Sequence, residues 1–217
     1  MEKALIKGYI AKRVAKEFKD GDFVNLGIGL PTMVPAYLPE DVHVILQAEV
    51  GMAGQGGKPE VADPNVVDAG GQPSSIAPGG AFIDSATSFG LIRGGHVNAT
   101  VLGALQVDEK GNLANWIIPG KMVPGMGGAM DLCAGVKKII VATDHCEKSG
   151  KSKILKKCTL PLTGVHCVTD IVTERCYFEV TKDGLVLREL AEGYSVEDIL
   201  ACTEADVIVP DEIGVMS

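Results

Sequence analysis

The stretch Phe23–Thr32 decides the fold, and it reads Phe-Val-Asn-Leu-Gly-Ile-Gly-Leu-Pro-Thr. Its first four residues form a short apolar run, which predicts a buried strand. The glycines that follow predict a tight turn, and Pro31 suits the first turn of a following helix. Upstream, residues 3–18 place apolar side chains at helical spacing between lysine, arginine and glutamate, which predicts an amphipathic helix.

The same alternation continues to the end of the chain. Further strands are predicted at residues 42–46, 99–105, 113–118, 138–143, 168–181 and 185–190, and helices at residues 85–92 and 195–203. Glycine-rich segments between them, at residues 51–57, 70–80 and 125–130, are predicted to be turns and loops. Short helices alternating with apolar strands predict an α/β fold, a layered mixed or parallel sheet with helices on both faces. With no internal repeat and no long linker, residues 1–217 are predicted to form a single domain.

Composition excludes several classes of function. Hydrophobic residues make up 46% of the 217 residues, which argues against disorder, and the net charge of −8 leaves no basic footprint for nucleic acid. The sequence shows no signal peptide, and no apolar run approaches the ~20 residues that a membrane span needs, so we expect a cytoplasmic chain without membrane contact. None of the six cysteines forms a Cys-x-x-Cys pair, which predicts reduced thiols and no metal site.

The strongest local feature is Leu46–Gly51, where Glu49 follows an apolar strand and precedes a run of glycines. In open α/β sheets, ligands bind at the carboxyl ends of the strands. A glutamate at that position is held in place by the strand, and the glycine turn that follows leaves it accessible to a ligand. The spacing is also compatible with a solvated glutamate on the surface.

A second feature is Gly125–Asp131, which contains Gly127 and Gly128. Backbone N–H groups without side-chain cover can stabilise an oxyanion, although a plain loop is equally compatible. No Gly-Lys-Ser/Thr follows, so this is not a Walker A loop. The segment Asn25–Gly29 lacks the full dinucleotide fingerprint, so a nicotinamide cofactor is not expected.

Taken in order along the chain, several stretches resemble the β subunit of 3-oxoacid CoA-transferases, including the acetate/butyrate–acetoacetate enzymes. They are residues 24–32, 91–96, 102–107, 114–132 and 157–164. The resemblance covers nearly the whole chain and implies the CoA-transferase (NagB/RpiA-like) fold. It also implies a partner α subunit, with α2β2 assembly expected, and a reaction on acyl-CoA and short carboxylic acids. Coenzyme A is then a co-substrate, and no permanently bound cofactor is expected.

The resemblance also assigns the site residues. Glu49 aligns with the family's catalytic glutamate, which lies in a Ser-Glu-Asn-Gly motif, whereas this chain reads Ala48-Glu49-Val50-Gly51. Backbone N–H groups at Gly128 and Gly127 are implied for the oxyanion. Four further residues are candidates for the substrate pocket: Val50, Gly51, Gly27 and Gly29. The changed motif puts the identity of the acyl substrate in question more than the class of reaction.

Three other functions compete with CoA transfer. A sugar-phosphate isomerase shares the architecture, but the order of the motifs argues against it. A thioester hydrolase would use water in place of the acceptor acid. The third is a non-catalytic subunit that supports an α chain, which Ala48 and Val50 make worth testing.

Overall fold

The computed structural model describes residues 3–121, 123 and 125–217, so Met1 and Glu2 of the N-terminal amphipathic stretch lie outside the described residues. The parallel strands are β1 (Phe23–Leu26), β2 (Ile45–Ala48), β5 (Ala99–Leu102), β8 (Lys138–Ala142) and β10 (Asp170–Val172). The strands that flank them are β3 (Met52–Gln55), β4 (Ile76–Phe82), β11 (Cys176–Thr181), β12 (Gly184–Ala191), β13 (Val207–Ile208) and β14 (Gly214–Met216).

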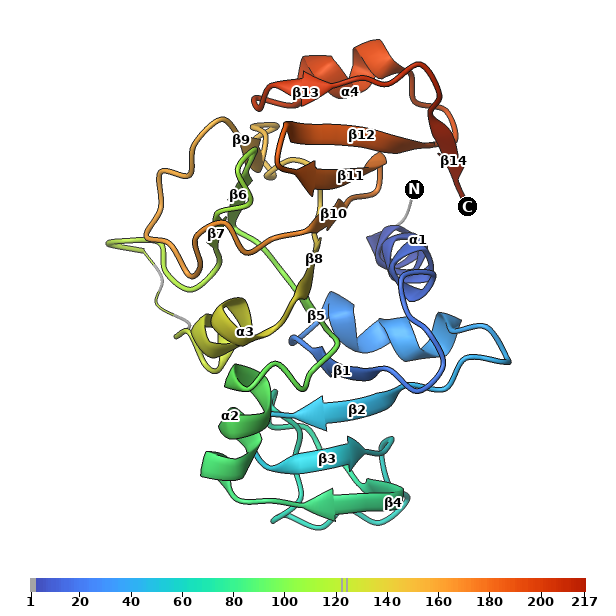
Figure 1. Ribbon diagram of the computed structural model, residues 1–217, viewed down its shortest axis with the longest axis vertical. Helices are drawn as coiled ribbons and strands as arrows, with labels where there is room; N and C mark the ends of the chain where they lie inside the picture. Colours follow the sequence, from blue (N-terminus) through green and yellow to red (C-terminus); the bar gives the residue numbers. More distant parts are fainter. Residues whose placement is uncertain (1–2, 122, 124) are drawn as a thin grey trace.

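These strands form one large mixed sheet that runs the length of the molecule (Figure 1). Their order is β13-β12-β11-β10-β8-β5-β1-β2-β3-β4, and β14 pairs with β12. The parallel order reverses at β1, because β2 lies on one side of it and β5, β8 and β10 lie on the other. Ligand sites of open α/β sheets lie at the carboxyl ends of strands beside such a reversal.

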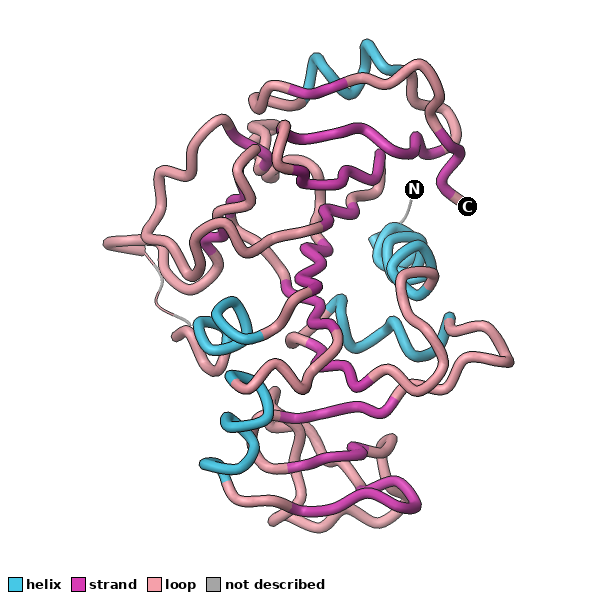
Figure 2. The backbone as a smooth tube through the Cα atoms, in the orientation of Figure 1, coloured by secondary structure: helices cyan, strands magenta, loops and turns pink. Residues whose placement is uncertain are grey.

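Helices cover both faces of the sheet, as the sequence predicted (Figures 1 and 2). The helix α1 (Lys3–Ala15) and the 3-10 helix η1 (Leu30–Tyr37) lie on one face. The helices α2 (Ser85–Arg93) and α3 (Ala129–Gly135) lie on the other, and α4 (Val196–Cys202) follows β12. A small sheet of β6 (Gln106–Asp108), β7 (Leu113–Ala114) and β9 (Ile154–Leu155) packs on the α3 side.

The core is divided between the two faces by the pleat of the strands. In β8, Ile139 packs in the cluster beneath α2 and α3, whereas Ile140 packs in the cluster beneath α1, and both are fully buried. Because neighbouring strand residues point to opposite faces, a strand covered on both sides is apolar at every position. This explains the continuous apolar run Ile139–Ala142 in β8.

An ion pair fixes α1 to β12, near one end of the large sheet. The Arg13 guanidinium is only 4% exposed, donates to the Glu189 carboxylate of β12 at 2.6 Å, and lies 4.1 Å from the centre of the Tyr177 ring. The bidentate geometry and the stacking are contacts that arginine makes and lysine does not. The helix therefore docks through charge as well as through its apolar side.

Several predicted boundaries are wrong. The helix after Pro31 is a 3-10 helix, with Pro35 inside it. The predicted strand at 42–46 lies at 45–48, so Glu49 follows its last residue directly. Residues 113–118 pair as a strand only at Leu113 and Ala114, and residues 168–181 form two antiparallel strands that turn at 173–175.

Candidate functional site

Glu49 lies in the tight turn that joins β2 to β3. Ala48 pairs with Met52, and the Gly51 N–H donates to the Ala48 carbonyl oxygen at 3.0 Å. Gly51 has a φ of 128°, and a side chain there would stand 2.5 Å from the Ile83 carbonyl oxygen, so only glycine fits. The turn thereby presents the Glu49 carboxylate at the carboxyl end of the strand.

A buried polar network holds this carboxylate. The Asn25 amide Nδ2 donates to Glu49 Oε2 at 3.0 Å and to Gln47 Oε1 at 2.7 Å, and the Gln47 amide Nε2 donates to Ser88 Oγ at 2.8 Å. The side chains of Asn25, Gln47 and Ser88 are at most 2% exposed. Asn25 and Gln47 are register partners in the β1–β2 pair, so strand pairing itself builds the support for Glu49.

The glycine-rich loop lies against the same glutamate. Gly125 and Gly127 adopt φ values of 89° and 50°, and Gly128 caps the N-terminus of α3. A side chain on Gly128 would stand 3.1 Å from Glu49 Cγ and 3.3 Å from Phe89 Cε1. The fold therefore brings the two strongest sequence features into contact, and glycine at position 128 lets the backbone approach the carboxylate.

Two contacts fix α3 against α2. Arg93 donates to the Asp131 carboxylate at 2.7 Å, which joins the last turn of α2 to the first turn of α3. At the other end of α3, a side chain on Gly135 would stand 2.1 Å from the Ile92 carbonyl oxygen, so the helices touch through backbone. Arg93 thus has a structural role in positioning the loop that faces Glu49.

A cavity of about 760 Å³ opens beside Glu49. Among the candidate site residues, Glu49 and Gly29 line it, together with residues of the 55–58 and 68–74 segments. Gly27 packs against β5, where its N–H donates to the Val101 carbonyl oxygen at 2.8 Å. Val50 lies in the turn beside Glu49 with 54% of its surface exposed, on the outside of the molecule.

Asn25, Gln47 and Ser88 were not predicted as site residues. A signal for the first two was available, because asparagine is depleted in strands, and an amide inside an apolar run needs a buried partner. Within the described residues, no group of three or more histidine, cysteine or acidic side chains could hold a metal ion. No helix in the same part of the chain is long and apolar enough to cross a membrane.

Comparison with known proteins identifies the family. The sequence matches the coenzyme A transferase family over residues 7–201. The chain belongs to this family. It is 57% identical to the β subunit of the acetate CoA-transferase of Haemophilus influenzae, over 97% of this chain and 95% of that protein. It is 45% identical to one subunit of the probable succinyl-CoA:3-ketoacid coenzyme A transferase of Bacillus subtilis, over 94% of this chain and 95% of that one.

The fold agrees with solved structures. The apoenzyme of the acyl-CoA transferase YdiF from Escherichia coli superposes with a TM-score of 0.78 at 23% identity, over 98% of this chain. This chain spans 43% of the length of that chain. The predicted α/β CoA-transferase fold and the resemblance to 3-oxoacid CoA-transferase β subunits are both confirmed.

Proposed function

We propose that this chain supplies the nucleophilic carboxylate, Glu49, of a two-subunit CoA-transferase that moves CoA between short-chain acyl-CoA thioesters and carboxylic acids. The observation that carries the proposal is the position of Glu49, at a strand's carboxyl end, beside a cavity and against the backbone of Gly128. Membership of the coenzyme A transferase family supports the class of reaction. The names of the relatives, which include acetate and 3-ketoacid transferases, support short acids as substrates.

The proposed reaction proceeds through two kinds of covalent intermediate, an acyl-glutamyl anhydride and a glutamyl-CoA thioester. The Glu49 carboxylate attacks the thioester carbonyl of the donor, which forms an acyl-glutamyl anhydride and releases the CoA thiolate. The thiolate then attacks the glutamyl carbonyl, which releases the donor acid and leaves a glutamyl-CoA thioester. The acceptor acid reverses these steps. One thioester is exchanged for another, so the reaction needs no ATP and follows ping-pong kinetics.

Each attack creates a tetrahedral oxyanion that needs hydrogen-bond donors. We assign this role to the backbone N–H of Gly128, with Gly127 shaping the turn that directs it. The close approach of Gly128 to the Glu49 side chain supports the assignment. Losing one such donor typically slows acyl transfer by roughly 100- to 1000-fold. The Asn25 amide keeps Glu49 Oε2 in place while the other oxygen attacks.

A partner α subunit is expected to complete the site. Both bacterial relatives are named as subunits, the first of them as a β subunit, which supports a two-chain enzyme. The face around Glu49 exposes apolar side chains, with Ile28 70%, Val50 54% and Phe82 60% exposed. Exposed apolar groups of this kind indicate a protein interface.

We propose that the α subunit covers this face in an α2β2 assembly. Gly27, Gly29, Val50 and Gly51 would then adjoin the acyl group, with CoA as co-substrate.

The test of the proposal is a set of position-49 variants, co-expressed and co-purified with the α subunit. We expect Glu49→Ala to abolish transfer and Glu49→Asp to lose most of it, because the shorter arm withdraws the oxygen by about 1 Å. Incubated with acyl-CoA alone, the unaltered enzyme should become sensitive to hydroxylamine, and the alanine variant should not. The matched control is Glu212→Ala, an exposed glutamate at the far end of the chain, which should retain full activity.

Three outcomes would overturn parts of this function. Full transfer activity in Glu49→Ala would remove the nucleophile and point to a supporting role for this chain. Release of free CoA at an unchanged rate without an acceptor acid would indicate a thioester hydrolase. Normal turnover by the isolated chain would contradict the need for an α subunit.

A further inference from the structure

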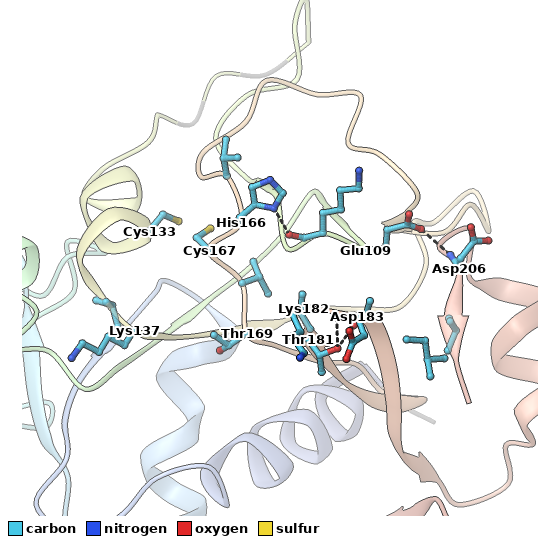
Figure 3. A pocket seen from close by; sticks show the side chains of 18 residues that line it. Glu109, Cys133, Lys137, His166, Cys167, Thr169, Thr181, Lys182, Asp183 and Asp206 are labelled. Atoms are coloured by element: carbon cyan, nitrogen blue, oxygen red, sulfur yellow. Dashed lines mark hydrogen bonds between the residues drawn. The ribbon is translucent and has the colours of Figure 1, made fainter. Parts of the chain in front are cut away.

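A second cavity lies away from Glu49, and two cysteines face each other in its wall. It has a volume of about 810 Å³ and is lined by residues of α3, β11 and the segment that leads into β10, as Figure 3 shows. Cys133 comes from the last turn of α3, and Cys167 lies three residues before β10. Their sulfur atoms point toward one another (Figure 3). Both side chains are partly exposed, so small reagents in the cavity can reach them.

The contact between the two thiols is close. A methyl group on Gly164 would stand 2.6 Å from the Cys167 sulfur, 2.9 Å from the Cys133 sulfur and 2.6 Å from Cys133 Cβ. Both sulfur atoms therefore lie within 3 Å of one point, in space that only a glycine leaves open. Disulfide formation requires side chains that already face each other at short range.

The backbone before Cys167 is held in a fixed turn. His166 adopts a φ of 50°, the left-handed region that residues other than glycine seldom adopt. Its N–H donates to Asn112 Oδ1 at 3.0 Å, and its ring Nδ1 bonds the Lys110 carbonyl oxygen at 2.9 Å. Cys167 is thus presented to Cys133 by an ordered turn.

The two thiols differ in acidity. The neighbouring Cys133 thiol lowers the pKa of Cys167, and the backbone N–H groups of Cys167 and Val168 act in the same direction. The neighbouring Cys167 thiol, together with burial, raises the pKa of Cys133. By contrast, burial and the nearby Asp108 raise the pKa of Cys158 to about 12, and burial raises the pKa of Cys176. A thiolate-forming cysteine beside a second thiol is the arrangement found in redox-sensing pairs.

We propose that Cys133 and Cys167 form a redox-active pair that closes an intramolecular disulfide when the chain meets a small-molecule disulfide such as oxidised glutathione. The Cys167 thiolate attacks one sulfur of the oxidant, whose S–S bond breaks and releases one glutathione thiolate. Cys133 loses its proton to solvent and attacks the Cys167 sulfur of the mixed disulfide, which releases the second glutathione. The two protein thiols are oxidised by two electrons, and the oxidant is reduced to two thiols.

The bond would link two elements that are separate in the fold. It would join α3 to the chain that enters β10, and α3 is the short helix whose N-cap is Gly128, beside Glu49. In a reducing compartment such a bond is transient and serves as a sensor. The proposal concerns the thiols alone and does not depend on the reaction assigned to Glu49.

The experiment is oxidation of the folded full chain, followed by peptide mapping. The reduced chain is treated with oxidised glutathione at pH 8, free thiols are alkylated, and the tryptic peptides are identified by mass. Trypsin places Cys133 in peptide 122–137, but Cys158 and Cys167 together in peptide 158–175. The Cys158→Ser variant is therefore the matched background, since it leaves Cys167 as the only thiol in its peptide.

We expect peptide 122–137 cross-linked to peptide 158–175, in the wild type and in Cys158→Ser alike, with the link reversed by dithiothreitol. In Cys133→Ser, the reaction should stop with one glutathione on Cys167. In Cys167→Ser, modification of Cys133 should slow at least tenfold. Absence of this cross-link in the folded Cys158→Ser chain would overturn the proposal, and so would cross-linking of Cys146 to Cys202 in its place.

Discussion

The large sheet has a far end, formed by β11 and β12, and a site end around Glu49, and the two bury different kinds of side chain at their centres. At the far end, β11, β12 and α4 meet through apolar groups that are fully buried: Phe178, Leu185, Leu187 and Ile199. At the site end, the groups buried beneath Glu49 are polar: Asn25, Gln47, Ser88 and Thr100. A buried hydrogen bond contributes only about 0.5–1.5 kcal/mol to stability, whereas truncating a large buried side chain costs about 2–5 kcal/mol. The difference indicates that the far end stabilises the fold and the site end fixes a geometry.

The largest expected effect comes from breaking the far end. Phe178→Ala should lower the free energy of unfolding by about 3–5 kcal/mol, because it leaves a cavity under a fully buried ring. The rate per folded molecule should not change, since Phe178 lies in β11, which β10, β8, β5 and β1 separate from β2 and Glu49. Urea unfolding gives the stability, and kcat at a temperature where the variant is folded gives the activity. A large fall in kcat of folded protein would contradict the division between the two ends.

Breaking the site end should have the reverse result. Asn25→Ala removes the donor to Glu49 Oε2, and we expect kcat to fall about 10- to 100-fold, or ~1.4–2.8 kcal/mol, with little change in KM. Asn25→Asp keeps the shape but sets a second carboxylate beside Glu49, so its loss should be at least as large. Thr100→Val is the control, because its hydroxyl reaches Asn25 Oδ1 only at 3.4 Å and should matter less. If Asn25→Ala raised KM and left kcat unchanged, Asn25 would bind substrate and not position Glu49.

The two ends also differ in how well the sequence predicts them. Apolar runs located β8 and β12 within a few residues, because there burial alone decides the structure, and the capping-box pattern at Ser195 located α4. Neither pattern found β4, whose Pro78-Gly79-Gly80 segment has the composition of a turn. That strand exists because of tertiary pairing: a side chain on Gly80 would stand 2.7 Å from the Gly54 carbonyl oxygen, so β3 and β4 approach through glycines.

The candidate site shows the same limit. The sequence pattern singled out both Glu49, at a strand end, and the glycine loop that contains Gly128, but their catalytic roles were predicted from the resemblance to the family. Asn25 was not found, because its contact with Glu49 depends on the register of β1 against β2, which no local pattern specifies. The assignment of roles to Glu49, Gly128 and the pocket residues stays a prediction, as does the single domain over residues 1–217.

A third prediction concerns one polar group at the far end, His145. Its ring is fully buried between the Thr173 and Thr203 hydroxyls, at 3.1 and 2.9 Å. Burial, helped by the charge of Arg175, lowers its pKa from 6.5 to about 4. The folded state therefore binds the proton less readily than the unfolded state, so stability is complete above about pH 6.5 and is lost as pH falls toward 4.

We expect a loss of about 2 kcal/mol between pH 7 and pH 5 from this group alone. His145→Gln can keep hydrogen bonds to the threonines but does not titrate, so its stability should depend less on pH over the same range. The measurement is the free energy of unfolding by urea at both pH values. Equal pH dependence in the wild type and in His145→Gln would show that His145 is not the group responsible.

The smallest expected effect is a change in substrate preference on substitution of Val50. It tests the part of the site end that we propose the α subunit covers. Val50 follows Glu49 directly and is 54% exposed, and the Ser-Glu-Asn-Gly motif expected from the resemblance has asparagine at this position. An amide there could donate to the 3-keto oxygen of acetoacetyl-CoA, whereas the valine side chain cannot. An unsubstituted acyl chain such as butyryl has no oxygen at that position to accept the hydrogen bond. One such hydrogen bond contributes about 1 kcal/mol, or roughly fivefold.

We therefore expect Val50→Asn, in the complex with the α subunit, to raise kcat/KM for acetoacetyl-CoA about fivefold relative to butyryl-CoA. Val50→Leu is the matched control, because it changes size without adding a donor. If the ratio moves by no more than about twofold in Val50→Asn, residue 50 does not contact the acyl group, and selectivity is set by other residues.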